Sequence, residues 1–265
     1  MNILFSINAK FIDLTKTCIQ SILRYDQDID FYILHHDLTK ENQEDLESTF
    51  SSCHFHFIEV DETQFKDFPI SSRYPLEIYY RLFASMLLPA DIDRILYLDV
   101  DIIVISSLKK LYTMDFENNL YIASTHISET MTLMNAKRLG LQKVVPYINT
   151  GVLLMNLEAL RNVVNKEEIL DFVNTHKNKL VLFDQDVLTA LYGDKTKIVE
   201  YTKYNLSERM MNFYNLRNPK DRIDLAWVRK NATIIHYCGR MKPWKDKYIG
   251  CLDVFYKEVK EKSHL

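Results

Sequence analysis

The feature that most constrains this sequence is the apolar run from Arg94 to Ile105, which reads RILYLDVDIIVI. The run is too short for the core of a helix, and it is rich in β-branched residues, which favour strands. A nearly continuous apolar run of this length is typical of a strand that is buried on both faces, as in parallel sheets. The sequence therefore predicts a buried strand of a parallel sheet.

Two acidic residues, Asp99 and Asp101, interrupt this run. Side chains two residues apart on a strand project to the same side, so the two carboxylates are expected to lie close together. Such a pair cannot remain fully charged between apolar neighbours without compensation. Either one carboxyl group is protonated, or an Arg or Lys lies between them, or they bind a divalent cation. A strand that simply ends in water is the fourth interpretation, and we favour the cation.

The composition excludes several classes of protein. With 265 residues, the chain can form one large α/β domain or two small ones. Its net charge of -3 argues against nucleic-acid binding, which usually requires an excess of basic residues. The first of the five glycines is Gly140, so no glycine-rich phosphate loop follows an early strand. Any phosphate must therefore be bound by a metal ion and basic side chains.

Cysteine usage and hydropathy indicate the compartment. The four cysteines show no CxxC spacing, and the first residues predict a strand rather than a signal peptide. No apolar run approaches the roughly 20 residues that a membrane span needs. We therefore expect reduced, mostly buried thiols in a cytoplasmic protein.

Strand and helix patterns alternate over the first hundred residues. Besides the apolar run, strands are predicted at 3–7, 31–34 and 54–58, with helices that begin near Asp13, Thr39 and Pro75. This order predicts an α/β fold with a mostly parallel central sheet, right-handed crossovers and flanking helices. Asn8 and the Asp99–Asp101 pair would then follow the carboxyl ends of strands, where such sheets bind ligands.

The second half of the chain has a more mixed pattern. It predicts strands at 120–124, 152–156 and 234–237, helices at 131–139 and, in two pieces, at 157–178, and a helix that starts at the cap 184–186. Residues 202–222 are polar and aromatic without a period, so we expect a long loop over the site. No linker interrupts the pattern, and one domain is the expected organisation.

His236 closes the last apolar strand and is the natural third protein ligand for a metal held by Asp99 and Asp101. An imidazole beside two carboxylates suits Mn²⁺, whereas Mg²⁺, the second candidate, accepts imidazole less readily. The residues that follow fit a diphosphate. Gly239 allows the backbone to approach a ligand, and Lys242 offers a positive charge.

Four segments together resemble the retaining, GT-A-fold glycosyltransferases of family 8, which include bacterial lipopolysaccharide galactosyl- and glucosyltransferases and glycogenin. The segments are 97–101 (YLDVD), 149–156 (NTGVLLMN), 184–186 (DQD) and 236–244 (HYCGRMKPW). Each is weak alone, but their common order and spacing are specific, and the resemblance spans nearly the whole chain. It implies a single Rossmann-like GT-A domain. A donor-binding half would cover about 1–110, a donor-sugar and acceptor half about 111–245, and a small helical tail 246–265.

The resemblance also implies the residues of the site. Mn²⁺ would be bound by Asp99, Asp101 and His236. The matching nucleotide-binding positions are Asn8, Phe11, Arg81, Asp99, Val100, Gly239 and Lys242. The donor-sugar positions are Arg81, Asn149, Gly151, Asp184 and Gln185. Gln185 is the implied catalytic residue, with Asp184 beside it.

The chain departs from the family pattern at four positions, one of which is Lys10, in place of a polar uncharged residue. Asn8 stands where the family usually carries an Asp, and Phe11 stands where it usually carries a Tyr. The Asn8 amide oxygen can still accept from a uracil N–H, and the Phe11 ring can still stack. His126 stands where some members carry an acidic residue near the sugar.

The function implied is transfer of glucose or galactose, with retention, from a UDP-sugar to a saccharide, lipid-linked or protein acceptor. Lipopolysaccharide or cell-surface glycan biosynthesis is the expected context. The metal and Lys242 would stabilise the departing UDP, and Gln185 the cationic sugar, through either front-face attack or a covalent intermediate. A sugar-nucleotide nucleotidyltransferase and a non-catalytic UDP-sugar-binding module are the alternatives. The former normally needs the glycine-rich loop that is absent here.

The C-terminal tail from Trp244 mixes lysines and aromatic residues with Asp and Glu. We interpret it as a packed helix. The alternative is a peripheral contact with the inner face of a membrane, near a lipid-linked acceptor.

Overall fold

A seven-stranded sheet forms the centre of the computed structural model, which describes residues 1–66, 68–71 and 75–261. The strand order is β3-β2-β1-β4-β7-β6-β8. The strands are β1 (Asn2–Ser6), β2 (Asp30–His35), β3 (His54–Glu59), β4 (Arg94–Leu98), β6 (Tyr121–Thr125), β7 (Ile148–Asn156) and β8 (Thr196–Ile198). The strands β3, β2, β1 and β4 are parallel, and so are β6 and β8, whereas β7 is antiparallel to both of its neighbours. The predicted mostly parallel sheet is confirmed.

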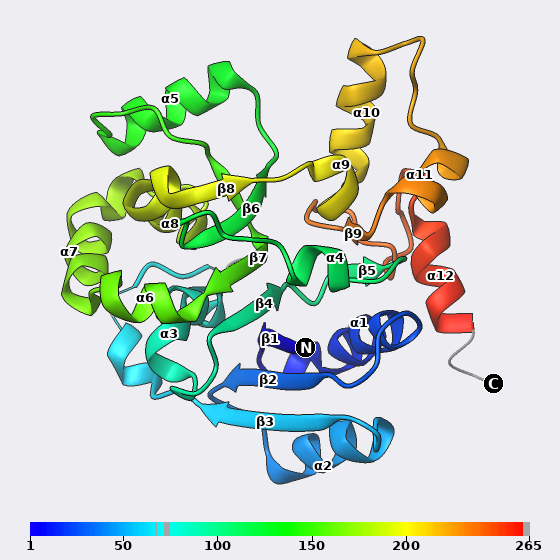
Figure 1. The fold of residues 1–265 in the computed structure, drawn as a ribbon, viewed down its shortest axis with the longest axis horizontal. Helices are drawn as coiled ribbons and strands as arrows, with labels where there is room; N and C mark the ends of the chain where they lie inside the picture. The colour runs from blue at the N-terminus through cyan, green and yellow to red at the C-terminus, as the bar shows by residue number, and fades with distance from the viewer. Residues whose placement is uncertain (67, 72–74, 262–265) are drawn as a thin grey trace.

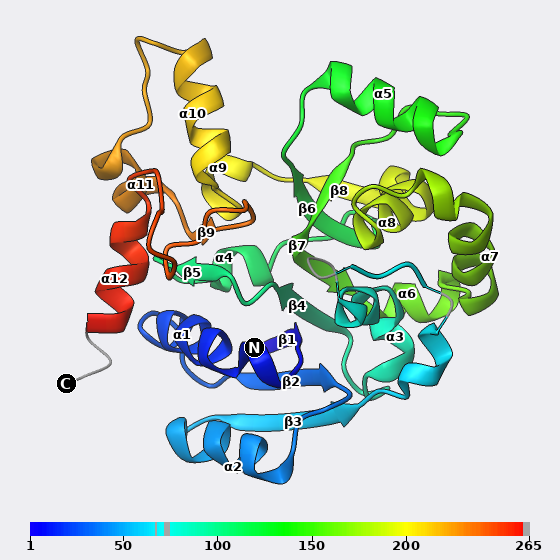
Figure 2. The same ribbon diagram turned by 180° about the vertical axis from the view of Figure 1, so that it is seen from behind.

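Helices cover both faces of this sheet (Figures 1 and 2). One group consists of α1 (Ile12–Leu23), α2 (Lys40–Thr49) and α4 (Lys109–Tyr112), and the other of α3 (Ala84–Leu87), α6 (Leu157–Val163), α7 (Lys166–His176) and α8 (Asp184–Tyr192). Alternate residues of β4 enter the two cores that these groups form. Ile95 and Tyr97 pack in the core with α3 and α6–α8, and Leu96 and Leu98 pack in the core with α1, α2 and α4. The prediction of burial on both faces therefore holds for β4.

The apolar run from Arg94 to Ile105 is not one strand, and that prediction is wrong. β4 ends at Leu98, and β5 (Ile102–Val104) pairs in a separate sheet with β9 (Ile234–His236), in antiparallel orientation. Residues 99–101 turn between them. The Asp99 N–H donates to the Gly151 carbonyl, and the Asp101 carbonyl accepts from the Tyr237 N–H. An apolar run signals burial, but it does not reveal that its two halves join different sheets.

The expected loop over residues 202–222 is also wrong, because this segment contains two helices. They are α9 (Tyr201–Tyr204) and α10 (Glu208–Arg217), with Ser207 as the N-cap of α10. α10 buries Met210 and Met211, but it exposes Phe213 and Leu216. This mixture of buried and exposed apolar residues removed the helical period from the sequence.

Other helices agree with the sequence, with small differences. α5 (Glu129–Leu139) ends at Gly140, whose φ of 71° is the left-handed conformation that glycine adopts freely. The predicted helix at 157–178 is present in two pieces, α6 and α7. The helix expected from Pro75 is mainly a 3₁₀ helix, η3 (Leu76–Phe83), which continues into α3.

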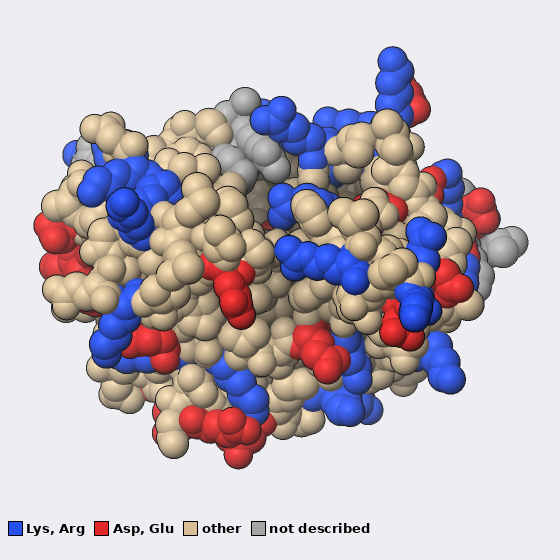
Figure 3. All heavy atoms as spheres, turned by 90° about the horizontal axis from the view of Figure 1, so that it is seen from above, with Lys and Arg blue, Asp and Glu red and all other residues tan. Residues whose placement is uncertain are grey.

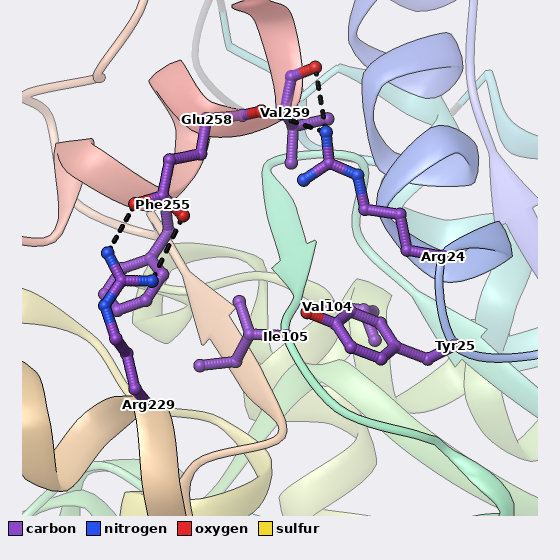
Figure 4. A pocket seen from close by; sticks show the side chains of 8 residues that line it. All are labelled: Arg24, Tyr25, Val104, Ile105, Arg229, Phe255, Glu258 and Val259. Carbon is purple, nitrogen blue, oxygen red and sulfur yellow. Dashed lines mark hydrogen bonds and ion pairs between the residues drawn. The ribbon is translucent and has the colours of Figure 1, made fainter. Parts of the chain in front are cut away.

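The described part of the C-terminal tail forms a packed helix, α12 (Asp253–Glu261), which buries Phe255, Tyr256 and Val259. Arg24 at the end of α1 donates to the Glu258 and Val259 carbonyls (Figure 4). In the same view, Arg229 of α11 (Leu225–Asn231) pairs with the Glu258 carboxylate. The apolar face of α12 is therefore used inside the chain. Residues 262–265 of the tail lie outside the described residues.

The helices of the described ranges are all too short or too polar to cross a bilayer. The cysteines are free thiols, but only Cys18 is fully buried, whereas Cys53, Cys238 and Cys251 are partly exposed.

Candidate active site

Asp99 lies directly after β4, and it uses one carboxylate oxygen for cationic and hydroxyl partners. Its Oδ1 accepts from the Tyr97 hydroxyl at 2.8 Å and lies 2.9 Å from the Arg81 guanidinium. Its other oxygen, Oδ2, lies 3.7 Å from His236 Nε2. Arg81 thus neutralises the Asp99 carboxylate at Oδ1, and Oδ2 remains on the side of His236.

Asp101 is compensated in the same way by a different cation. Lys242 Nζ donates to Asp101 Oδ2 at 2.5 Å and to the Tyr237 carbonyl at 2.6 Å. Burial alone would raise the pKa of Asp101, but His236, when its imidazole is protonated, and the Lys242 ammonium hold that pKa well below its usual range. Asp101 Oδ1 is buried 3.1 Å from His236 Nε2 and has no hydrogen-bond partner among the described residues.

These three residues fit a divalent cation. One ligand atom of each, from Asp99, Asp101 and His236, lies within 4.8 Å of the other two. Both Asp101 Oδ1 and His236 Nε2 are buried and lack a hydrogen-bond partner in the part of the chain that the structure describes, which is costly unless something else satisfies them. Gly151 keeps the space beside them open. A Cβ there would lie 2.3 Å from His236 Cε1 and 2.6 Å from Asp99 Oδ2.

Arg81 links this cluster to the start of α8. Its side chain is almost completely buried and stacks over the Tyr97 ring, with Cζ 4.1 Å from the ring centroid. It donates to the Thr150 carbonyl at 2.8 Å and lies 3.5 Å from Asp184 Oδ2. Asp184 also accepts from the Thr150 hydroxyl at 2.8 Å. Burial raises the pKa of Asp184 to about 6, although Arg81 and Thr150 act in the opposite direction.

The start of α8 is held by Asp186, which is completely buried. Its carboxylate accepts hydrogen bonds from the Arg138 guanidinium, the Tyr147 hydroxyl and the backbone N–H groups of Val181 and Leu182. Phe183, which precedes α8, has a φ of 37°, an unusual value for a bulky residue. Of the three residues predicted to cap α8, only Asp186 binds backbone amides before the helix, and Asp184 points instead to Thr150 and Arg81.

Gln185 and Asn149 lie next to each other, and Asn149 also contacts Gly151. Asn149 Oδ1 accepts from the Gly151 N–H at 3.1 Å, and its Nδ2 lies 3.5 Å from Gln185 Oε1. Direct contacts therefore join nine predicted site residues into one cluster: Arg81, Asp99, Asp101, Asn149, Gly151, Asp184, Gln185, His236 and Lys242.

Within the described residues, the side chains of the four remaining predicted positions make no hydrogen bond or ion pair to this cluster. Asn8 follows β1, the parallel neighbour of β4, and its side chain accepts from the Lys10 N–H. Phe11 is partly buried, and Val100 lies in the turn between the two aspartates. Gly239 is exposed, and a Cβ there would meet open space. No described neighbour therefore requires glycine at this position.

Two residues of the site, His126 and Asn205, do not belong to the predicted set. The sequence marks His126 only as a departure from the family pattern. It is buried, donates to the Asn205 carbonyl at 2.6 Å, and has a pKa that burial lowers to about 3. Asn205 lies in the segment that was predicted to be a loop, and its sequence carries no signal of a role. It contacts His236, Asn149 and His126.

The surface between α5 and α10 is hollowed (Figure 3). In this view from above, side chains of Lys and Arg border the hollow on the side of α10. A basic border of this kind favours the approach of anionic ligands.

Comparisons with known proteins give the family and the fold of the chain. The profile of the family described as Glycosyl transferase family 8 matches residues 2–248. A putative glycosyltransferase of Haemophilus influenzae is 28% identical over 262 residues, which cover 95% of this chain and 76% of that protein. A lipopolysaccharide 1,2-glucosyltransferase of Escherichia coli is 30% identical over 190 residues, or 71% of this chain and 55% of that protein.

The fold is also similar to that of the galactosyltransferase LgtC, solved in complex with donor and acceptor sugar analogues. The TM-score is 0.83 at 24% identity, and the alignment covers 99% of this chain and 96% of that chain. This likeness identifies the fold as GT-A.

Proposed function

The chain belongs to glycosyl transferase family 8, and on this basis we propose that it transfers glucose or galactose from a UDP-sugar to a saccharide acceptor with retention. The acceptor would be a free, lipid-linked or protein-linked glycan. A lipopolysaccharide glucosyltransferase among the relatives supports an acceptor of the lipopolysaccharide or cell-surface class. The observation that carries the proposal is a pair of buried ligand atoms, Asp101 Oδ1 and His236 Nε2, that have no hydrogen-bond partner within residues 1–66, 68–71 and 75–261 and have Asp99 Oδ2 beside them.

Asp99, Asp101 and His236 would bind a divalent cation, with Mn²⁺ preferred over Mg²⁺ because imidazole is one of the ligands. When bound, the cation would neutralise charge on the diphosphate of the donor. Lys242 has three N–H donors, of which Asp101 and the Tyr237 carbonyl take two. The third is left for a phosphate oxygen.

Gln185 would act on the sugar. As the bond between the anomeric carbon and the phosphate oxygen breaks, the ring becomes cationic, and the amide oxygen of Gln185 would stabilise it. The oxygen of the acceptor hydroxyl would form the new bond, and its proton would pass to the leaving phosphate oxygen. Asp184 is buried and engaged by Arg81 and Thr150, so it is poorly placed as a nucleophile. This favours front-face attack over a covalent intermediate.

In this proposal, the two halves of the chain contribute different parts of the site. The donor-binding half, about 1–110, contributes Asn8 and Phe11 for uracil and both aspartates of the cation site. The half at about 111–245 contributes Asn149, Gln185 and the segment around Lys242. Arg81 is only 4% exposed, so it would act by holding Asp99 and Asp184 rather than by contact with the donor. The free cysteines fit a reducing compartment such as the cytoplasm.

A donor panel tests this proposal. The purified chain is incubated with Mn²⁺ and UDP-glucose, UDP-galactose, ADP-glucose or GDP-mannose, and release of the nucleoside diphosphate is measured. We expect hydrolysis of a UDP-hexose, its loss in Asp101→Asn and its retention in Asp171→Asn, a matched exposed control on α7. Release of pyrophosphate from UTP and a sugar 1-phosphate would instead indicate a nucleotidyltransferase. Binding of UDP-sugars without turnover in any acceptor mixture would indicate a binding module.

A further inference from the structure

Asn205 is completely buried between three elements of the site. Its side-chain Nδ2 donates to Asn149 Oδ1 at 2.9 Å, and its Oδ1 lies 2.8 Å from His236 Nδ1. Its backbone carbonyl lies 2.6 Å from His126 Nε2, and its backbone N–H donates to the Tyr201 carbonyl. One side chain therefore joins β7 to β9, across the space where the ligand atoms meet.

The hydrogen bonds that link Gly151, Asn149, Asn205 and His236 in series have only one consistent direction. The Gly151 backbone N–H can only donate, so the Asn149 side-chain atom 3.1 Å away is the oxygen. That oxygen also faces the Asn205 side chain, so the Asn205 atom there is the amide nitrogen. The Asn205 oxygen consequently faces His236 Nδ1, which must carry a proton.

A neutral imidazole carries one N–H, so a proton on Nδ1 leaves Nε2 of His236 with a lone pair. Nε2 lies 3.1 Å from Asp101 Oδ1 and 3.7 Å from Asp99 Oδ2, which are acceptors as well. In the alternative tautomer, Nε2 would donate to Asp101 and would no longer have a lone pair for a cation. The choice of tautomer therefore decides whether His236 is a cation ligand or an ion-pair partner of Asp101.

We propose that Asn205 is the positioning residue that selects the Nδ1–H tautomer of His236 and so directs its Nε2 lone pair toward both carboxylates. This inference rests on the proposed function, in which His236 binds a divalent cation. The backbone N–H of Gly151 fixes the donor and acceptor of every hydrogen bond in this series, through Asn149 and Asn205. Ligand histidines commonly have such a partner on the second ring nitrogen, and its loss typically reduces metal affinity by about 10- to 100-fold.

Nitrogen NMR of the histidine side chains in the metal-free protein tests the tautomer directly. The spectrum is recorded at a pH where imidazole is neutral, and His236 is assigned by the loss of its signals in His236→Gln. We expect an Nδ1–H, Nε2-unprotonated imidazole in the unmodified protein and an Nε2–H imidazole in Asn205→Leu. An Nε2–H form in the unmodified protein would overturn the proposal, whether or not the enzyme is active.

Calorimetry with Mn²⁺ in the presence of UDP provides the second measurement. Asn205→Leu should bind Mn²⁺ about 10- to 100-fold more weakly, whereas Asn205→Asp, which keeps an acceptor for Nδ1, should recover most of the affinity. Asn215→Leu is the matched control, because Asn215 makes two backbone hydrogen bonds to Ile223, away from the site.

The outcomes separate this inference from the proposed function. Unchanged tautomer and Mn²⁺ affinity in Asn205→Leu would reject the role of Asn205 and leave the proposed function intact. Should Asn205→Leu fail to fold, the tautomer of the unmodified protein and the Asn205→Asp affinity still decide the matter. Absence of Mn²⁺ binding in the unmodified protein would reject the cation site, and an Nδ1–H tautomer would then show only that Asn205 orients the ring.

Discussion

Lys242 Nζ donates to Asp101 Oδ2 at 2.5 Å, so the lysine expected at the diphosphate is ion-paired with an aspartate expected at the cation. Asp99 has an equivalent partner in Arg81 at 2.9 Å. The two cations differ in burial, because the Arg81 side chain is 5% exposed and that of Lys242 is 21% exposed. We therefore expect the two carboxylates to contribute differently to stability, although both belong to the same proposed cation site.

Substitution of the two aspartates should reveal this difference. Asp99→Ala leaves Arg81 buried with Asp184 as its remaining carboxylate, and we expect destabilisation of up to about 3 kcal/mol. Asp101→Ala leaves only the partly exposed Lys242 and should have a much smaller effect. Both variants should lose Mn²⁺-dependent UDP binding. Urea unfolding and calorimetry measure the two effects, and equal stability of the variants would contradict the assignment of partners.

Lys242→Ala should weaken the binding of UDP much more than that of uridine. A charge-assisted contact with phosphate is worth about 1.5–3 kcal/mol, or roughly 10- to 100-fold in affinity. Lys245→Ala is the control, since Lys245 is exposed on the same segment. Calorimetry with both ligands would count against the phosphate contact if the affinities for uridine and UDP fell equally.

Two glycine substitutions should separate metal binding from nucleotide binding. In Gly151→Ala, the new Cβ would meet His236 and Asp99, so Mn²⁺ affinity should fall sharply. In Gly239→Ala, the Cβ meets open space, so stability and Mn²⁺ affinity should not change, whereas UDP affinity falls if the backbone approaches the diphosphate. Normal Mn²⁺ binding by Gly151→Ala would show that the ligand atoms lie elsewhere.

Asp184 should make stability depend on pH. Its pKa of about 6 in the folded chain lies above the ordinary value of 3.8, so the folded state retains the proton longer than the unfolded state. This contribution to stability is present below about pH 4 and is lost as the pH rises through about 6. Asp184→Asn should remove this part of the pH dependence. Urea unfolding at pH 4.5 and 7 measures it, and the same pH-dependent difference in both proteins would contradict the shift.

Gln185→Ala should bind the donor almost normally and lose most of its turnover. An interaction that strengthens only as the sugar becomes cationic lowers the barrier and contributes little to ground-state binding. Because Asp186 rather than Gln185 holds the start of α8, the melting temperature should hardly change. A destabilised variant with kcat within a few-fold of the unmodified value would exclude Gln185 from the mechanism.

The sequence by itself determined the alternation of strands and helices, the mostly parallel sheet and the three residues that converge at the proposed cation site. Local period and burial depend on residues a few positions apart, and these signals are present in the amino-acid order. Gly140 at the end of α5 and the paired aspartates after an apolar strand are examples. The aspartates converge as predicted, but through a turn between two sheets rather than along one strand.

Only the tertiary structure decided which groups neutralise the aspartates and which orient His236. Lys242 and Asp101 are 141 positions apart, and Asn205 and His236 are 31 positions apart. Such pairs depend on how β5, β7 and β9 pack around the turn at 99–101. A hydrogen bond between distant residues leaves no periodic trace in one sequence, because its energy depends on a geometry that exists only after the chain has folded.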